Sequence, residues 1–88
     1  MGVRRFDPPP IIQLWPDRRG QPSLFVWRRR TRVVAALRHK WSLKTEWWRG
    51  DDAAIDRDYY ELATRDGMVC VIFHDRAAEV WHLESIYD

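Results

Sequence analysis

The chain has a single cysteine, Cys70, among its 88 residues, which excludes an internal disulfide and a metal site built from several cysteines. It also lacks any apolar run close to the roughly 20 residues that cross a bilayer. The N-terminal segment has two arginines with no apolar stretch behind them, which is not the pattern of a secretory signal peptide. These absences predict one small cytoplasmic domain without membrane association.

Residues that would form a catalytic or metal centre follow no recognisable spacing. His74 and His82 fall on opposite faces of the strands predicted below, and His39 lies in another part of the chain. Cys70 sits in a run of valine, isoleucine and phenylalanine, which is typical of an inert buried thiol. The sequence therefore predicts a protein that is not an enzyme and that has no metal site and no cofactor.

Lysine is scarce, and the basic residues are 13 arginines against two lysines. Arginine is preferred where planar, bidentate or stacking contacts matter. Residues 1–50 hold 12 basic and 3 acidic residues, a balance of +9, whereas residues 51–88 hold 3 basic and 10 acidic residues, a balance of −7. The two halves are expected either to pair across the fold or to steer a charged partner, nucleic acid included.

Tryptophan, in contrast, is abundant, with six in the chain. Trp27 precedes three arginines, and the pair Trp47-Trp48 precedes Arg49. Tryptophan supplies a large contact area, and it is costly to leave exposed. This composition predicts either a core that depends on aromatic side chains or a surface that presents them to a partner.

Short apolar runs separated by turn residues predict a mostly β fold. We expect a single small antiparallel domain over residues 11–88, barrel-like or half-barrel, with five to six strands. Residues 1–10 end in three prolines and are expected to form an extended arm. The strands are expected over residues 11–15, 23–27, 31–37, 57–65, 68–74 and 79–87.

Two turns predict a register for the last three strands. Asp66-Gly67 has the signature of a two-residue hairpin turn, and residues 75–78 have that of a four-residue loop. Counting back from these turns places Tyr60 opposite Phe73, and Phe73 opposite Val80. Both faces of this sheet are then largely apolar, so we expect both to be covered or one to be a binding surface.

Two other connections are less regular. The link Arg28–Arg30 contains no glycine, so a tight turn would force a positive φ onto an arginine, and a three-residue loop or a bulge is the alternative. His39–Ala54 has the weakest periodicity and is expected to be the long loop of the domain. One helical turn, capped by an aspartate, is the expectation for Asp51–Ile55.

Basic and aromatic residues around the first hairpin suggest nucleic-acid binding. Small β-barrels bind single strands through a positive groove with aromatic rings on which bases stack. The alternative is that the tryptophans belong to the core and that arginine stems cover its rim. The candidate nucleic-acid-binding residues are Arg28, Arg29, Arg30, Arg32, Arg38 and Lys40.

Four segments carry a resemblance to known proteins: Phe25-Val26-Trp27-Arg28, Glu46-Trp47-Trp48-Arg49-Gly50, Arg57-Asp58-Tyr59-Tyr60 and Trp81-His82-Leu83. In this order they resemble a small family of bacterial domains of unknown function. Members occur alone or as the C-terminal domain of ImuB, a catalytically inactive homologue of Y-family polymerases. The matching family positions are Trp27, Trp47, Trp48, Arg49, Arg57, Asp58, Tyr59, Tyr60 and Trp81.

The resemblance implies a function. The C-terminal region of ImuB gathers partner proteins, so the resemblance implies a non-enzymatic adaptor with a protein partner, in bacterial DNA damage tolerance and translesion synthesis. A module that binds single-stranded or damaged DNA is the alternative. At the matching positions, Arg49 or Arg57 is expected to pair with Asp58 beside Trp47 or Trp48. A binding surface built from the same residue types is the competing interpretation.

Overall fold

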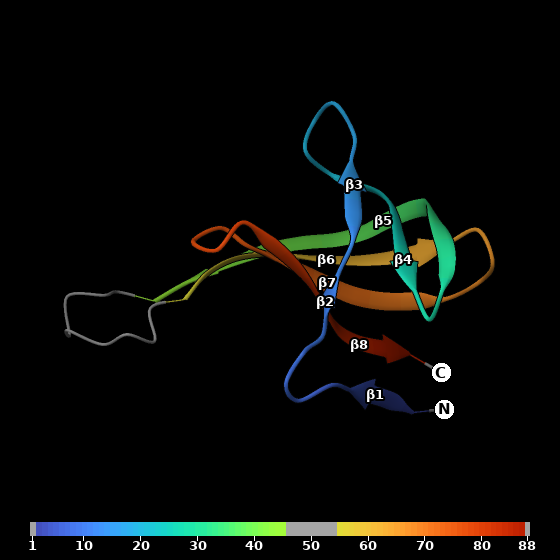
Figure 1. Ribbon diagram of the computed structural model, residues 1–88, viewed down its shortest axis with the longest axis horizontal. Coiled ribbons are helices and arrows are strands. Elements are labelled where there is room, and N and C mark those ends of the chain that lie inside the picture. The colour runs from blue at the N-terminus through green and yellow to red at the C-terminus, as the bar shows by residue number, and fades with distance from the viewer. Residues whose placement is uncertain (1, 46–54, 88) are drawn as a thin grey trace.

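The computed structural model describes residues 2–45 and 55–87, and in that part it contains eight strands and no helix (Figure 1). The strands are β1 (Val3–Arg5), β2 (Ile11–Ile12), β3 (Leu14–Pro16), β4 (Pro22–Trp27), β5 (Arg30–Lys44), β6 (Asp56–Thr64), β7 (Val69–Asp75) and β8 (Val80–Tyr87). The predicted mostly β class is confirmed. The helical turn expected at residues 51–55 falls, except for Ile55, outside the described residues.

The strands form one antiparallel sheet in the order β1-β8-β7-β6-β5-β4-β3, with β2 also paired to β8. The segment that contains β2 and β3 changes partners, because Ile11–Ile12 pair with β8 whereas Leu14–Pro16 pair with β4. The sheet therefore curls strongly, and this short segment links its two ends (Figure 1). The architecture is a half-barrel, as predicted, and not a closed barrel.

The main hydrophobic core lies inside the curl. Phe25, Leu62, Ile72 and Leu83 are fully buried there, and they come from four different strands. Burial of each such side chain contributes roughly 1.5–3 kcal/mol. The core therefore ties β4 to the sheet formed by β6, β7 and β8.

The turn between β6 and β7 is one residue longer than predicted. The N–H of Gly67 donates to the carbonyl of Thr64 (3.1 Å), and Gly67 has a φ of +90°. This is a three-residue hairpin loop that ends on a left-handed glycine. The predicted register is therefore wrong by one residue: Tyr59 lies opposite Phe73, and Tyr60 faces the core instead.

The loop between β7 and β8 has four residues, as predicted, but it begins one residue later. The carboxylate of Asp75 accepts hydrogen bonds from two backbone N–H groups of the loop (3.1 and 3.2 Å), and Glu79 closes the loop with a φ of +57°. His82 therefore lies opposite Phe73, in the place that was predicted for Val80.

The strand β5 is longer than predicted. Residues His39–Lys44, expected to belong to the long loop, pair with residues of β6 in an uninterrupted register. The expectation was wrong because this segment has only two large apolar residues, Trp41 and Leu43, and both are partly exposed to solvent.

The first ten residues run along the strand β8. Val3–Arg5 form the edge strand β1, which pairs with β8. The N–H of Phe6 donates to the carbonyl of Glu84, and the N–H of Leu83 donates to the carbonyl of Pro10, both at 3.0 Å. The segment is therefore fixed along β8 at several points.

Candidate interaction site

The face of the sheet that points away from the main core carries a row of ring side chains. The register places them directly opposite one another on β5, β6, β7 and β8: Trp41, Tyr59, Phe73 and His82. Trp41 stacks on Tyr59 with ring centroids 5.4 Å apart and an interplanar angle of 3°. Phe73 stacks on His82 at 4.7 Å, and Tyr59 contacts Phe73 at 5.2 Å. We call these four residues the outer aromatic row.

The middle of the outer aromatic row is buried, whereas its β5 end is exposed. Phe73 is 1% exposed, and Trp41 is 42% exposed. The guanidinium carbon of Arg57 lies 4.4 Å from the ring centroid of Phe73, and its Nη1 donates to the hydroxyl of Tyr59 (3.2 Å). Other protein groups therefore cover the inner rings, and Trp41 offers the surface that a partner can reach.

The strand β5 forms an open edge beside Trp41. Arg30–Val33 pair with β4, and Val34–Lys44 pair with β6 on the other side of the strand. No strand in residues 2–45 and 55–87 covers the second side of Val34–Lys44. We call this segment the open edge.

One hydrogen bond shows which backbone groups point outward from the open edge. The N–H of Thr45 donates to the carbonyl of Ile55 (2.8 Å), across the extension of the β5–β6 ladder. Successive residues of a strand direct their backbone groups to alternate sides, so Leu43 and Trp41 also face β6. The N–H and C=O groups that point to the open side are those of Lys40, Ser42 and Lys44.

The open edge is basic. No residue of β5 is acidic, and every residue from Arg38 to Lys44 is exposed. Arg38 and His39 each lie 3.8 Å from the carboxylate of Glu61 on β6. The Nζ of Lys40 lies 5.5 Å from the ring centroid of Tyr60 on the other face. An approaching strand would meet positive charge and one exposed indole.

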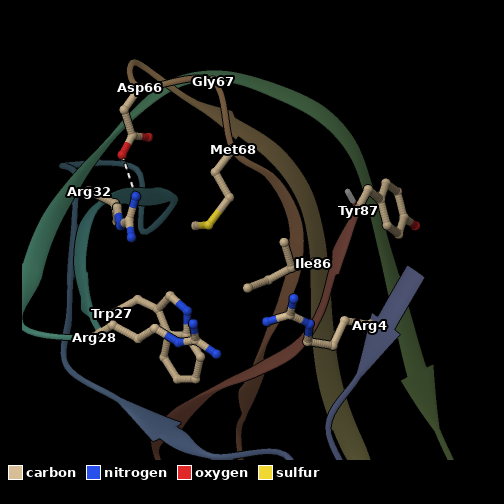
Figure 2. A pocket seen from close by; sticks show the side chains of 9 residues that line it. All are labelled: Arg4, Trp27, Arg28, Arg32, Asp66, Gly67, Met68, Ile86 and Tyr87. Atoms are coloured by element: carbon tan, nitrogen blue, oxygen red, sulfur yellow. Dashed lines mark hydrogen bonds and ion pairs between the residues drawn. The ribbon is translucent and has the colours of Figure 1, made fainter. Parts of the chain in front are cut away.

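The other end of β5 borders an open pocket of about 480 Å³. Its lining comes from the strands β1, β4, β5 and β8 and from the two hairpin turns that precede β5 and β7 (Figure 2). The side chains that give the pocket its character are three arginines and three apolar residues: Arg4, Arg28, Arg32, Trp27, Met68 and Ile86.

Arg28 reaches this pocket from a strained turn. Trp27 pairs with Arg30, so the intervening Arg28 and Arg29 form the tight two-residue turn, and their φ values are +51° and +65°. Such turns favour asparagine, aspartate and glycine. A left-handed conformation costs other residues roughly 1–2 kcal/mol each.

Arg32 lines the pocket beside the β6–β7 turn. It pairs through Nη1 with the carboxylate of Asp66, which also accepts a hydrogen bond from the hydroxyl of Thr64 (Figure 2 shows the pair). The Thr64 hydrogen bond and then Arg32 hold the pKa of Asp66 below its ordinary value. The Nε of Arg32 has no hydrogen-bond partner within the described residues. The hydrogen-bonding capacity of this guanidinium is therefore not exhausted.

The six candidate nucleic-acid-binding residues do not form one patch. Arg28 and Arg32 line the pocket, whereas Arg29–Arg30 are exposed and do not line it. Arg38 and Lys40 belong to the open edge, roughly 25 Å or more from Arg30 along the strand. The candidate residues therefore fall into two separate basic regions, one around the pocket and the first hairpin and one along the open edge.

The residues at the family positions have different environments. Tyr60 lies in the main core, where burial raises its pKa, and Trp27 and Trp81 are half-buried against that core. Tyr59 and Arg57 belong to the outer face. Three positions lie outside the described residues: Trp47, Trp48 and Arg49.

The expected pair between Arg57 and Asp58 does not form, because adjacent strand residues point to opposite faces. Arg57 contacts Phe73, whereas Asp58 accepts a hydrogen bond from Ser42 (2.6 Å) and lies 4.0 Å from Arg76. The alternative partner in that prediction, Arg49, lies outside the described residues.

The remaining reactive groups do not form a centre within the described residues. Burial raises the pKa of the Cys70 thiol to about 12. In residues 2–45 and 55–87, no group of three histidine, cysteine, aspartate or glutamate residues is placed to hold a metal ion. In the same part of the chain, no helix has the length and apolar character needed to cross a membrane.

The sequence contained a signal for part of the site. Residues 39–44 alternate between polar positions and the apolar Trp41 and Leu43, which is the period of a strand with one partly exposed face. The sequence did not indicate that Phe73 and His82 belong to the same row, because the turn pattern predicted the wrong strand register for them. No sequence pattern linked Arg4 to Arg28, because these residues are far apart in the chain.

A family model described as "Domain of unknown function (DUF6504)" matches residues 3–88, and the chain belongs to this family. The match spans all eight strands, from β1 to β8. No curated protein and no solved structure matches the chain.

Proposed function

We propose that this DUF6504 domain is a non-enzymatic protein-interaction module that accepts an extended segment of another protein as an additional strand. The observation that carries the proposal is the open edge, where outward-pointing backbone groups lie beside an exposed tryptophan. Addition of a strand to a free sheet edge is a common mode of peptide recognition, in which main-chain hydrogen bonds supply affinity.

The length of the open edge suits a short peptide. Lys40, Ser42 and Lys44 each direct one N–H and one C=O outward, as the hydrogen bond of Thr45 to Ile55 implies. A partner strand of about six residues would extend for roughly 20 Å and would pair with all three.

The side chains of the open edge define the chemistry of the partner. On the outer face, Trp41 and Leu43 offer exposed apolar surface. On the opposite face, Lys40 and Lys44 offer positive charge. Because the side chains of an added strand also alternate between faces, the partner segment alternates apolar and acidic residues.

Charge favours another protein over a second copy of this chain. Two copies that paired through β5 would bring two basic strands together, with no acidic residue on either. Like charges directly opposite each other on neighbouring strands destabilise the pairing. An acidic segment removes this repulsion and gains the opposite-charge contacts.

The setting of the proposal comes from the resemblance to the C-terminal domain of ImuB. That resemblance supports an adaptor role in DNA damage tolerance and translesion synthesis in the bacterial cytoplasm. Two partner classes fit such a role, a repair protein that presents an acidic extended segment and, as the second candidate, DNA itself.

Direct binding of single-stranded DNA has one observation in its favour, the exposed arginines Arg28, Arg29 and Arg30 at the tip of the first hairpin. The outer aromatic row gives it less support. Tyr59 and Phe73 are buried and His82 is half-buried, so Trp41 is the one exposed ring that this row offers for stacking against a base. Affinity that falls steeply with salt would favour the DNA candidate, because each phosphate contact releases counterions.

The proposal is tested by peptide selection with two variants of Ser42. A phage library of random peptides about ten residues long, enough to cover the edge, is selected against the parent domain. We expect peptides that alternate acidic and apolar residues. S42P removes an N–H that points to the open side, and S42A is the matched control that keeps it. Selected peptides should bind S42P about tenfold more weakly and S42A as the parent.

Three results would contradict this proposal. Selected peptides that bind S42P as tightly as the parent would exclude pairing through the open edge. Selection of basic or uncharged sequences would exclude the charge complementarity to Lys40 and Lys44. A dimer of the parent in sedimentation that S42P abolishes would assign the edge to a second copy of this chain.

A further inference from the structure

We propose that the pocket between the β4–β5 and β6–β7 turns binds a phosphate monoester, with Arg28 and Arg32 as its principal ligands. This site is separate from the open edge and independent of the function proposed for it. Figure 2 shows the guanidinium groups and the apolar side chains arranged around the same cavity.

The charge of the lining favours a dianion. Among the described residues, the lining contains three arginines and one carboxylate, that of Asp66, which is already paired with Arg32. A planar guanidinium matches the oxygens of a phosphate group through two parallel hydrogen bonds. A phosphate monoester carries −1.5 to −2 charges at neutral pH and offers three acceptor oxygens, so it suits this set better than a single carboxylate does.

The conformation of the turn provides an independent observation. Arg28 adopts a φ of +51° at a position where glycine or asparagine would fit without strain. Local strain of this kind points to a functional constraint when the strained residue also contributes to a site. Arg28 meets this condition because its side chain lines the pocket, whereas the equally strained Arg29 does not.

The apolar wall indicates what the phosphate is attached to. Trp27, Met68 and Ile86 line the same cavity as the arginines. Its volume of about 480 Å³ lies within the usual range for small-molecule sites. These features fit a phosphate on a flat or apolar body, as in a nucleoside 5′-monophosphate or in the 5′-phosphorylated end of a DNA strand.

The two sources share the phosphate monoester and differ in the rest of the ligand. Isothermal titration of the full chain with thymidine 5′-monophosphate, with thymidine, and with dT oligonucleotides bearing a 5′-phosphate or a 5′-hydroxyl separates them. We expect the phosphorylated member of each pair to bind more tightly, by about tenfold or more. Equal affinity for the mononucleotide and the 5′-phosphorylated oligonucleotide would indicate a free nucleotide, and tighter binding of the oligonucleotide would indicate a strand end.

The two arginines of the turn supply a matched pair of variants. R28G and R29G each remove one positive charge and one left-handed arginine from the same turn, but only R28G removes a residue that lines the pocket. We expect R28G to weaken the binding of thymidine 5′-monophosphate about tenfold and R29G to change it less than about twofold. Circular dichroism and thermal melting confirm that both variants fold.

The proposal is overturned if thymidine binds as tightly as its monophosphate, or if no phosphorylated probe binds. It is also overturned if R28G and R29G weaken the binding of thymidine 5′-monophosphate equally, because that result would mean a non-specific charge effect. None of these outcomes involves Ser42 or peptide binding, so the proposal for the pocket and the proposal for the open edge are tested independently.

Discussion

The two ends of β5 are both basic, yet the fold uses their charge differently. At the pocket end, Arg32 is 14% exposed and is paired with Asp66, and the same pocket is lined by Arg28 of the preceding turn and Arg4 of the distant strand β1. At the other end, Arg38–Lys44 are all exposed along an unpaired strand edge. Converging charges suit a small anion, whereas charges spread along an edge suit an extended chain. The surroundings of a basic residue therefore say more about its partner than its charge does.

The largest expected effect concerns the outer aromatic row, which supports the open end. F73A removes a ring that is 1% exposed, and we expect it to lower the free energy of unfolding by about 3–5 kcal/mol. W41A removes a ring that is 42% exposed, and we expect a loss of only about 1 kcal/mol. Urea denaturation of the parent and both variants measures the two values.

The stability losses of these two variants show whether Trp41 is needed for folding or is free to contact a partner. A domain of this size has a stability of roughly 5–15 kcal/mol, so F73A can leave too little folded protein to measure. F73L then replaces it, with an expected loss below about 1.5 kcal/mol if the cavity repacks. A loss for W41A as large as that for F73A would make Trp41 a structural residue and would remove the main side-chain argument for a docking edge.

A smaller effect with the opposite sign is expected at the pocket end. Arg28 and Arg29 both have positive φ values, so R28G and R29G should each raise the free energy of unfolding. Relief of about 1–2 kcal/mol of strain exceeds the roughly 0.5–1 kcal/mol that glycine loses in chain entropy, which leaves a gain of about 0.5–1 kcal/mol. Thermal melting of the two variants checks this gain. A destabilised R28G would mean that Arg28 makes a stabilising contact that outweighs its backbone strain.

The fold class was predictable because it depends on short-range patterns. Apolar alternation located the strands of the second half, and the half-barrel followed from their number and from two apolar faces. The register was not predictable from the same patterns. Asp66-Gly67 fits both a two-residue turn and a three-residue loop that ends on Gly67, and the choice moves Tyr60 from one face to the other.

The candidate sites were only partly predictable, because each depends on contacts between distant segments. The sequence pointed to Arg28 and Arg32 as binding residues, but it could not show that they lie on one cavity with Arg4 of β1. It also could not show that β4 ends its pairing at Val33, which is what leaves the open edge of β5 without a neighbour. Both facts follow from the curl of the sheet and not from any local pattern.

The smallest expected effect is a pH dependence confined to the pocket end. The hydroxyl of Thr64 and the guanidinium of Arg32 lower the pKa of Asp66 from its ordinary 3.8. A carboxyl with a lower pKa in the folded chain adds stability above its unfolded-state pKa and loses that contribution as the pH falls through its folded-state pKa.

D66N removes this titration while it keeps a side chain of similar shape. The stability advantage of the parent over D66N should therefore be present at pH 6 and should disappear in strong acid, as urea denaturation at both pH values would show. An advantage that is the same at both pH values would mean that the carboxylate charge contributes nothing to holding Arg32 at the pocket wall.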